Sequence, residues 1–146
     1  MGYLLNDNTI GVLFNDRSSF VKLGDNQVIW IERVRVQGKE KTQVYFEHKI
    51  PFTLQYKFQI FKEIEAQLFP YKKGVKKQAI IDENARYLFY LYKWQREQSC
   101  VMFRMSTNLI QANFKDKTLL WIDQSGSEEV VSYQVKLSPH FQVSKL

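Results

Sequence analysis

The side chains that most often do chemistry in proteins are sparse in this 146-residue chain. It has two histidines, His48 and His140, and a single cysteine, Cys100. One cysteine cannot build the usual zinc cluster, and the histidines are isolated from one another in the sequence. No phosphate-binding loop and no GxGxxG segment is present. We therefore expect a binding module with no catalytic residue, no metal and no cofactor.

Positive charge is the other chemical signal in the sequence. The net charge is +6 and the isoelectric point is about 9.4. Such a balance favours acidic partners: phosphopeptides, nucleic acid or an anionic membrane surface. The densest cluster is "YKKGVKK", residues 71–77, where four lysines surround Gly74. A solvated linker is the simplest interpretation of this cluster, because four lysines do not identify a partner.

The composition excludes several other classes of protein. Apolar residues make up 45% of the chain and aromatic residues 15%, which is typical of a globular, β-rich core. No apolar run approaches the ~18 residues of a membrane span, and the N-terminus lacks the features of a signal peptide. A single cysteine permits no internal disulfide, which favours a reducing compartment inside the cell.

Residues 2–50 have the pattern of a β-meander. Five short apolar stretches are separated by turn residues at intervals of ~8–12 residues, the spacing of consecutive antiparallel strands. The last stretch, "TQVYFEHKI", runs to Pro51. In "VIWIERVRV" the apolar alternation changes phase near Glu32 and Arg33, which predicts a bulge or bend there.

The hydrophobic period changes after Pro51, a residue suited to a helix start. Apolar residues then recur at steps of three and four, which predicts an amphipathic helix over residues 52–69 that ends at Pro70. The stripe consists of Leu54, Phe58, Phe61, Ile64, Leu68 and Phe69. A helix cannot bury such a stripe alone, so we expect it to lie across the sheet, with Phe58, Phe61 and Ile64 buried.

The second half of the chain repeats the strand pattern. Residues 83–97 are ambiguous between helix and strand, four clearer strands follow up to Pro139, and only a short stub remains. The halves align at an offset of one hundred residues, which predicts two similar β-meander units. The matched pairs are Asn8 with Asn108, Ile10 with Ile110, Phe14 with Phe114, Asp16 with Asp116, and Arg17 with Lys117.

Two long segments resemble the polo boxes of polo-like kinases. "MGYLLNDNTIGVLFNDRSSFVKL", followed by "VIWIER", resembles the first box, with its Gly-Val-x-Phe-Asn-Asp and aromatic-Ile-Glu-Arg runs. "FYLYKWQREQSCVMFRMSTNLIQANFKDKT" is similar to the start of the second, with its Trp-x-Arg run and Asn-Phe turn. The family also has a helix between the boxes, where this sequence predicts one, so the resemblance covers nearly the whole chain.

The resemblance implies an α+β fold of two tandem polo boxes, each an antiparallel six-stranded sheet with a helix packed across it. Box 1 would occupy residues 1–70, a basic linker 71–85, and box 2 residues 86–146, without the family's C-terminal helix. In the family, a phosphorylated Ser/Thr peptide binds in the groove between the boxes. This docks a serine/threonine kinase at mitotic structures such as the centrosome, basal body and kinetochore.

The resemblance also implies site residues. Where the family grips phosphate with a His-x-Lys pair, this chain has Lys117 and Leu119, so one cation of the pair is lost. The groove tryptophan of the family lies upstream of Gly2 and has no counterpart in this sequence. Four further residues fall at groove positions: Arg96, Asn113, Leu68 and Phe69.

Three functions remain open from the sequence. The first is a phosphopeptide-docking module of a polo-like kinase. The second, favoured by Leu119, is a phosphate-independent interaction or dimerisation module of the same fold, in which another copy of the chain could supply the missing helix. The third, a basic nucleic-acid or membrane-surface binder acting through the lysines of 72–77, is the least supported.

Overall fold

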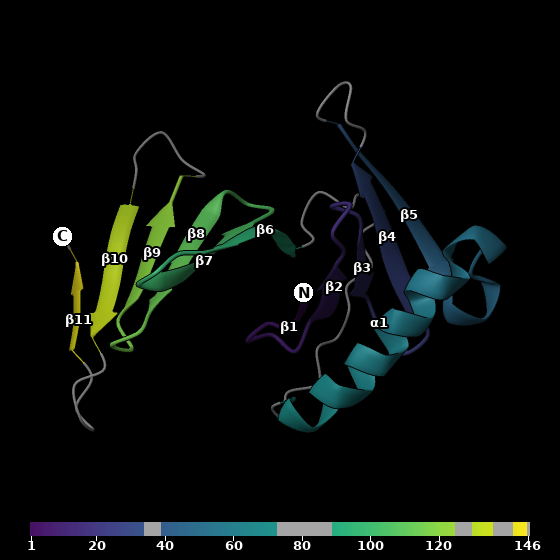
Figure 1. Cartoon of the computed structure of the whole chain (residues 1–146), viewed down its shortest axis with the longest axis horizontal. Helices are drawn as coiled ribbons and strands as arrows, with labels where there is room; N and C mark the ends of the chain where they lie inside the picture. The colour runs from purple at the N-terminus through teal and green to yellow at the C-terminus, as the bar shows by residue number, and fades with distance from the viewer. Residues whose placement is uncertain (34–38, 73–88, 125–129, 136–141, 146) are drawn as a thin grey trace. The chain divides into compact units, whose positions relative to one another are not determined.

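The computed structural model describes residues 1–33, 39–72, 89–124, 130–135 and 142–145 (Figure 1). The chain divides into two compact units, Met1–Leu88 and Phe89–Leu146. The linker predicted over 71–85 lies outside the described residues from position 73 onward.

The first unit is an antiparallel meander covered by one helix (Figure 1). Its sheet has the order β1-β2-β3-β4-β5, so neighbours in sequence are neighbours in the sheet. The strands are β1 (Gly2–Leu4), β2 (Ile10–Leu13), β3 (Ser19–Lys22), β4 (Gln27–Arg33) and β5 (Glu40–Phe46). Two short 3-10 turns, η1 (Glu47–Lys49) and η2 (Phe52–Leu54), lead into α1 (Gln55–Leu68), and a third, η3 (Phe69–Tyr71), follows it.

The predicted helix is confirmed, with 3-10 turns at both of its ends. Phe61, from the middle of α1, is fully buried against Phe20 of β3, with ring centroids 5.8 Å apart. Phe58 and Ile64 are only partly buried, because they lie at the margin of the same core. The core of the unit comprises Ile10, Val12, Phe20, Val28, Trp30, Ile50 and Phe61.

Three details of the first unit differ from the sequence-based expectations. The predicted bulge near Glu32 and Arg33 is absent, since β4 and β5 pair in unbroken register through Arg33 and Glu40. Strand β5 ends at Phe46, and residues Glu47–Lys49 form η1 instead of continuing the strand. Where six strands were expected, the described residues of this unit form five.

The second unit is a six-stranded antiparallel meander with the order β11-β10-β9-β8-β7-β6 (Figure 1). Its strands are β6 (Leu91–Arg96), β7 (Cys100–Met105), β8 (Leu109–Phe114), β9 (Leu119–Asp123), β10 (Val130–Val135) and β11 (Gln142–Lys145). Within the ambiguous segment, which the structure describes from residue 89 onward, Leu91–Arg96 form the edge strand β6, with a register shift between Leu91 and Lys93. The C-terminal stub was not expected to form an element, yet β11 pairs with β10. No helix occurs among the described residues of this unit.

The predicted repeat appears directly in the backbone. Four residues other than glycine have positive φ in the described part of the chain, and they form two pairs: Asn8 (66°) with Asn108 (63°), and Arg17 (69°) with Lys117 (72°). The left-handed conformation is uncommon for residues with a Cβ, so its recurrence at the aligned positions is specific evidence. The two units therefore share their tight turns as well as their strand order.

Candidate functional site

The turn that joins β8 to β9 presents Lys117 at one end of the second sheet. The amide of Phe114 donates to the carbonyl of Thr118 at 2.9 Å, and the amide of Lys117 donates to the carbonyl of Phe114 at 3.0 Å. These bonds close a three-residue hairpin loop whose last residue, Lys117, takes the left-handed conformation. Lys115, Asp116 and Lys117 are all exposed.

Asp116 is the residue that shapes this turn. Its Oδ1 accepts a hydrogen bond from the amide of Thr118 at 2.8 Å, the pattern by which aspartate side chains stabilise turns. The same hydrogen bond lowers the pKa of Asp116, because it stabilises the carboxylate form. The turn therefore carries one negative and two positive side chains at neutral pH.

A row of four side chains crosses the sheet just inside this turn. Arg96 pairs with Val101, Val101 pairs with Asn113, and Asn113 pairs with Leu119 in the strand register. Residues directly opposite each other on neighbouring strands point to the same face. Arg96, Asn113 and Leu119 therefore share one face of the second sheet, and Leu119 is the immediate neighbour of Asn113.

The amide group of Asn113 is held in place from its own strand. Gln111, two residues earlier on the same face, donates from Nε2 to Oδ1 of Asn113 at 2.7 Å. With its oxygen engaged in this way, the Asn113 side chain has its NH₂ group available as a donor. An amide donor between Arg96 and the turn of Lys117 is suited to an anionic ligand.

A second turn lies beside the turn of Lys117. The amide of Lys115 donates to the carbonyl of Ser99 at 3.0 Å, and Ser99 belongs to the turn between β6 and β7. Arg96, the last residue of β6, precedes that turn and is exposed. The structure thus brings Arg96, Asn113 and Lys117 to one end of the second sheet.

The other two predicted site residues lie at the end of α1, in the first unit. Leu68 is half-buried and packs against the hydrophobic core, as expected of a residue that completes the apolar face of the helix. Phe69 is 63% exposed, and Nζ of Lys72 lies 5.4 Å from its ring centroid. Of the two, Phe69 offers the accessible apolar surface.

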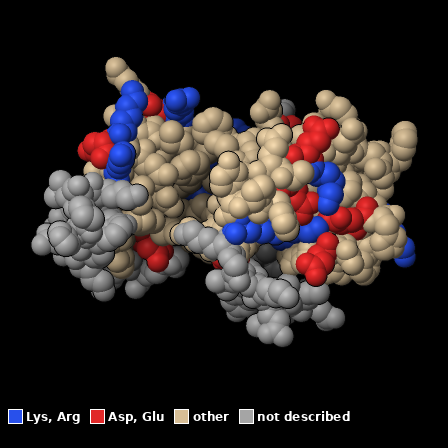
Figure 2. All heavy atoms as spheres, turned by 90° about the horizontal axis from the view of Figure 1, so that it is seen from below, with Lys and Arg blue, Asp and Glu red and all other residues tan. Residues whose placement is uncertain are grey.

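The charged side chains around α1 are largely used within the fold. Nζ of Lys62 lies 3.2 Å from a carboxylate oxygen of Glu47 and 2.5 Å from one of Glu65, and Lys22 pairs with the same two carboxylates. Acidic and basic side chains accordingly lie side by side over the helix-bearing unit in Figure 2. These ion pairs fasten the helix to the sheet.

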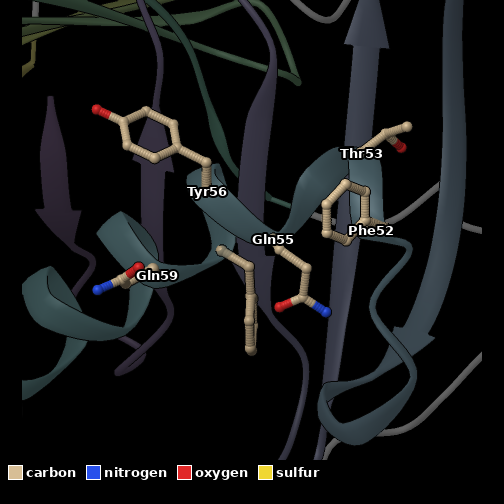
Figure 3. A pocket seen from close by; sticks show the side chains of 6 residues that line it. Phe52, Thr53, Gln55, Tyr56 and Gln59 are labelled. Carbon is tan, nitrogen blue, oxygen red and sulfur yellow. The ribbon is translucent and has the colours of Figure 1, made fainter.

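A surface depression lies on the first unit, over the start of its helix. It is lined by Phe52, Thr53, Gln55, Tyr56, Phe58 and Gln59, which project from η2 and the first turns of α1 (Figure 3). No side chain in this lining is charged. Within the described residues, no cluster of His, Cys, Asp or Glu could hold a metal ion, and no helix is long and apolar enough to cross a membrane.

Sequence reasoning missed two residues of this sheet end, Gln111 and Lys115. The contact of Gln111 with Asn113 follows from their spacing of two on one strand, which places both on the same face. Lys115 could have been found by comparing the aligned turns, because "NDR" at 15–17 becomes "KDK" at 115–117.

Comparison with known proteins shows what the chain resembles. The family described as "POLO box duplicated region" matches residues 1–58. The first unit is thus similar to a polo box. Polo-box domains of budding yeast Cdc5 have the same fold over 99% of the chain, with TM-scores of 0.69 for the complex with a Spc72 phosphopeptide and 0.72 for the domain alone, at 22% identity.

The chain also matches parts of longer kinases. It is 25% identical over 129 residues to the probable serine/threonine-protein kinase CCRP1 of Zea mays, covering 88% of the chain and 21% of that protein. It is 27% identical over 117 residues to the serine/threonine-protein kinase PLK1 of Xenopus laevis and 32% identical over 120 residues to plk-2 of Caenorhabditis elegans. Each of these matches covers 78% of the chain, but only 19% and 18% of the respective kinases.

Proposed function

We propose that this chain is a non-catalytic docking segment of a serine/threonine kinase, and that it binds partner proteins through phosphorylated Ser or Thr residues. The observation that carries the proposal is the end of the second sheet, where the exposed cations Arg96 and Lys117 flank the amide of Asn113. The ion pairs found among the described residues include neither cation.

The chemistry of phosphate fits this arrangement. A phosphoryl group carries about −1.5 to −2 charges at neutral pH and has three strong acceptor oxygens. Lys117 offers a point charge, Arg96 a planar fork of donors, and Asn113 a neutral amide donor. The complex of the Cdc5 polo-box domain with a Spc72 phosphopeptide supports the same class of ligand for a chain of this fold.

A specific observation favours a second function, in which peptides bind without phosphate. Leu119 is apolar and lies directly opposite Asn113, where a second cation was expected from the family pattern. Loss of a charge-assisted hydrogen bond costs roughly 1.5–3 kcal/mol. That cost is about a ten- to hundredfold loss of affinity at 1.4 kcal/mol per decade. Apolar contacts of the peptide, such as one with Leu119, would then supply much of the binding energy.

Two turn variants separate these functions. Binding would be measured by fluorescence anisotropy with a labelled phosphothreonine peptide library and with the same library lacking phosphate. Lys117→Ala is expected to abolish the preference for phosphate, whereas Arg17→Ala, at the aligned position of the first unit, leaves it unchanged. Leu119→Lys is expected to increase the preference. Equal binding of both libraries by the wild type, unaltered by Leu119→Lys, would favour the phosphate-independent function.

The location and assembly of the protein follow from this proposal. A kinase-docking segment acts inside the cell, and the centrosome, basal body and kinetochore are the expected sites. A fluorescent fusion of the chain in dividing cells, compared with the Lys117→Ala variant, tests that expectation. A diffuse signal for both proteins would argue against it. Nucleic acid and membranes are not expected partners, whereas a homodimer is.

A further inference from the structure

The two aligned hairpin turns have the same backbone but different charges. Each turn consists of three residues that follow a Phe. The second of the three is an aspartate, Asp16 or Asp116, and the third is a cation, Arg17 or Lys117, with φ near 70°. In both, the aspartate Oδ1 accepts the amide two residues ahead, at 3.1 Å from Ser18 and 2.8 Å from Thr118. The first position is Asn15 in one turn and Lys115 in the other, so the backbone does not require a lysine there.

The surroundings of the two aspartates also differ. Asp16 forms an ion pair with Lys57 of α1, whose Nζ lies 4.9 Å from the ring centroid of Trp30. Asp116 forms no ion pair among the described residues. The ammonium groups of Lys115 and Lys117 therefore do not contact its carboxylate. The turn of the second unit has two solvated ammonium groups around one hydrogen-bonded carboxylate.

Lys115 has a backbone hydrogen bond that is not found for its counterpart Asn15 among the described residues. The amide of Lys115 bonds the carbonyl of Ser99 at 3.0 Å, which joins the turn between β8 and β9 to the turn between β6 and β7. Arg96 immediately precedes the turn that contains Ser99, and Lys117 belongs to the same turn as Lys115. The backbone of Lys115 therefore links the part of the candidate site that holds Arg96 to the part that holds Lys117. A flexible lysine side chain on a fixed backbone can reach an anion bound at this sheet end.

We propose that Lys115 supplies the second cation of the phosphate site, in place of the charge that Leu119 lacks. A phosphorylated peptide residue would then be held by Lys115 and Lys117, with Arg96 and Asn113 in support. Two ammonium groups suit a ligand with close to two negative charges better than one does. This inference rests on the proposed phosphopeptide function, and it changes which residues recognise the phosphate.

The test compares lysine variants that keep side-chain length. Lys115→Met removes the charge, Lys115→Arg retains it, and Lys93→Met is the control, because Lys93 is an exposed lysine on the opposite face of the same sheet. Each variant would be titrated with the phosphothreonine library and with the library lacking phosphate. Lys115→Met is expected to reduce the preference for phosphate about tenfold, whereas Lys115→Arg and Lys93→Met retain it.

A double variant tests whether one cation replaces the other. Leu119→Lys introduced into Lys115→Met is expected to restore the preference for phosphate. The inference is overturned if the wild type prefers phosphate and Lys115→Met behaves like Lys93→Met. If the wild type binds both libraries equally, the proposed phosphate function itself fails, so the two failures are distinguishable.

Discussion

Arg17 and Lys117 adopt the same left-handed backbone conformation, with φ angles of 69° and 72°, at the aligned positions of the two hairpin turns. Each is the last residue of its loop, and its amide donates to the carbonyl of the preceding Phe at 3.0 Å. Because the backbones match, a difference in ligand binding between the turns must come from their side chains. The first unit therefore provides matched controls for variants of the second.

Arg17→Gly is expected to stabilise the first unit slightly. A left-handed conformation costs an L-residue about 1–2 kcal/mol, and glycine avoids most of that cost. The greater freedom of glycine in the unfolded chain offsets part of the gain, so we expect an increase in unfolding free energy of less than about 1 kcal/mol. Urea denaturation measures it. A loss of stability would show that the Arg17 side chain contributes more than its backbone strain costs.

Gly11→Ala is expected to destabilise the first unit by about 1–3 kcal/mol, the usual cost of overpacking. Gly11 pairs directly with Tyr3 across β1 and β2, and an added Cβ would collide with the Tyr3 ring and hydroxyl. Thermal unfolding would be measured for Gly11→Ala in the wild-type and in the Tyr3→Ala background. The cost should be much smaller without the ring, and an equal cost in both backgrounds would contradict the steric explanation.

Phe61→Ala is expected to cost roughly 3–5 kcal/mol, through lost burial and the cavity that remains. Phe61 is fully buried, whereas Tyr56 on the same helix is 76% exposed. Tyr56→Ala is therefore the control, with an expected change within about 0.5 kcal/mol. Chemical denaturation would measure both. Similar losses of stability for the two variants would show that α1 does not bury the face that carries Phe61.

The unfolding free energy should fall as the solution is acidified below about pH 5. Burial tends to raise the pKa of Glu47, but hydrogen bonds from Lys22 and Lys62 outweigh it, and the net pKa lies below the ordinary value of 4.5. The unfolded state then binds more protons than the folded state in this range, so stability is lost as the pH falls through the folded-state pKa.

Glu47→Gln should reduce that acid sensitivity, which a series of urea titrations between about pH 3 and pH 7 would measure. Glu63→Gln is the control, because Glu63 is exposed and takes part in none of the ion pairs found among the described residues. If both variants keep the wild-type pH profile, the Glu47 ion pairs contribute nothing to stability.

Self-association is expected from the second unit. Ile110, Leu120 and Ile122 lie together on one face of its sheet and are half-buried, whereas their counterparts Ile10 and Phe20 are fully buried with Phe61 of α1. Partly exposed apolar faces of this kind favour association.

Sedimentation velocity should therefore give a mass that rises with protein concentration. Leu120→Glu should weaken the association about tenfold, whereas Val44→Glu, on the edge strand of the first unit, should not. A single monomeric mass at high micromolar concentration would contradict the expectation.

The sequence predicted the helix and the turns better than it predicted irregularities of the strands. Turn residues such as Asn8 and Asp16 act locally, so their pattern was sufficient to find the repeat. The predicted bulge at Glu32 was wrong. Val28–Ile31 are buried on both faces of the sheet, and in such a strand the alternation of apolar and polar residues does not reveal the register. The real register shift, between Leu91 and Lys93, depends on how β6 pairs with β7, which the residue pattern of β6 alone does not show.

The site was predicted only as far as its residues match the family pattern. Lys117, Arg96 and Asn113 were found in this way, and the strand register brings them to one sheet end. Lys115 was missed because a lysine in a polar turn is ordinary in isolation. Its backbone bond to Ser99 joins residues sixteen apart, a relationship that depends on how three strands align.

The tryptophans are divided between the two units, and this gives each unit its own optical signal. Trp30 is 4% exposed and lies beneath the ammonium group of Lys57, while Trp94, 39% exposed, and Trp121 belong to the second sheet. A Trp30→Phe protein would therefore emit from the second unit alone. Comparing its melting curve with that of a Trp94→Phe/Trp121→Phe protein would reveal whether the two halves unfold as one cooperative body or in separate steps.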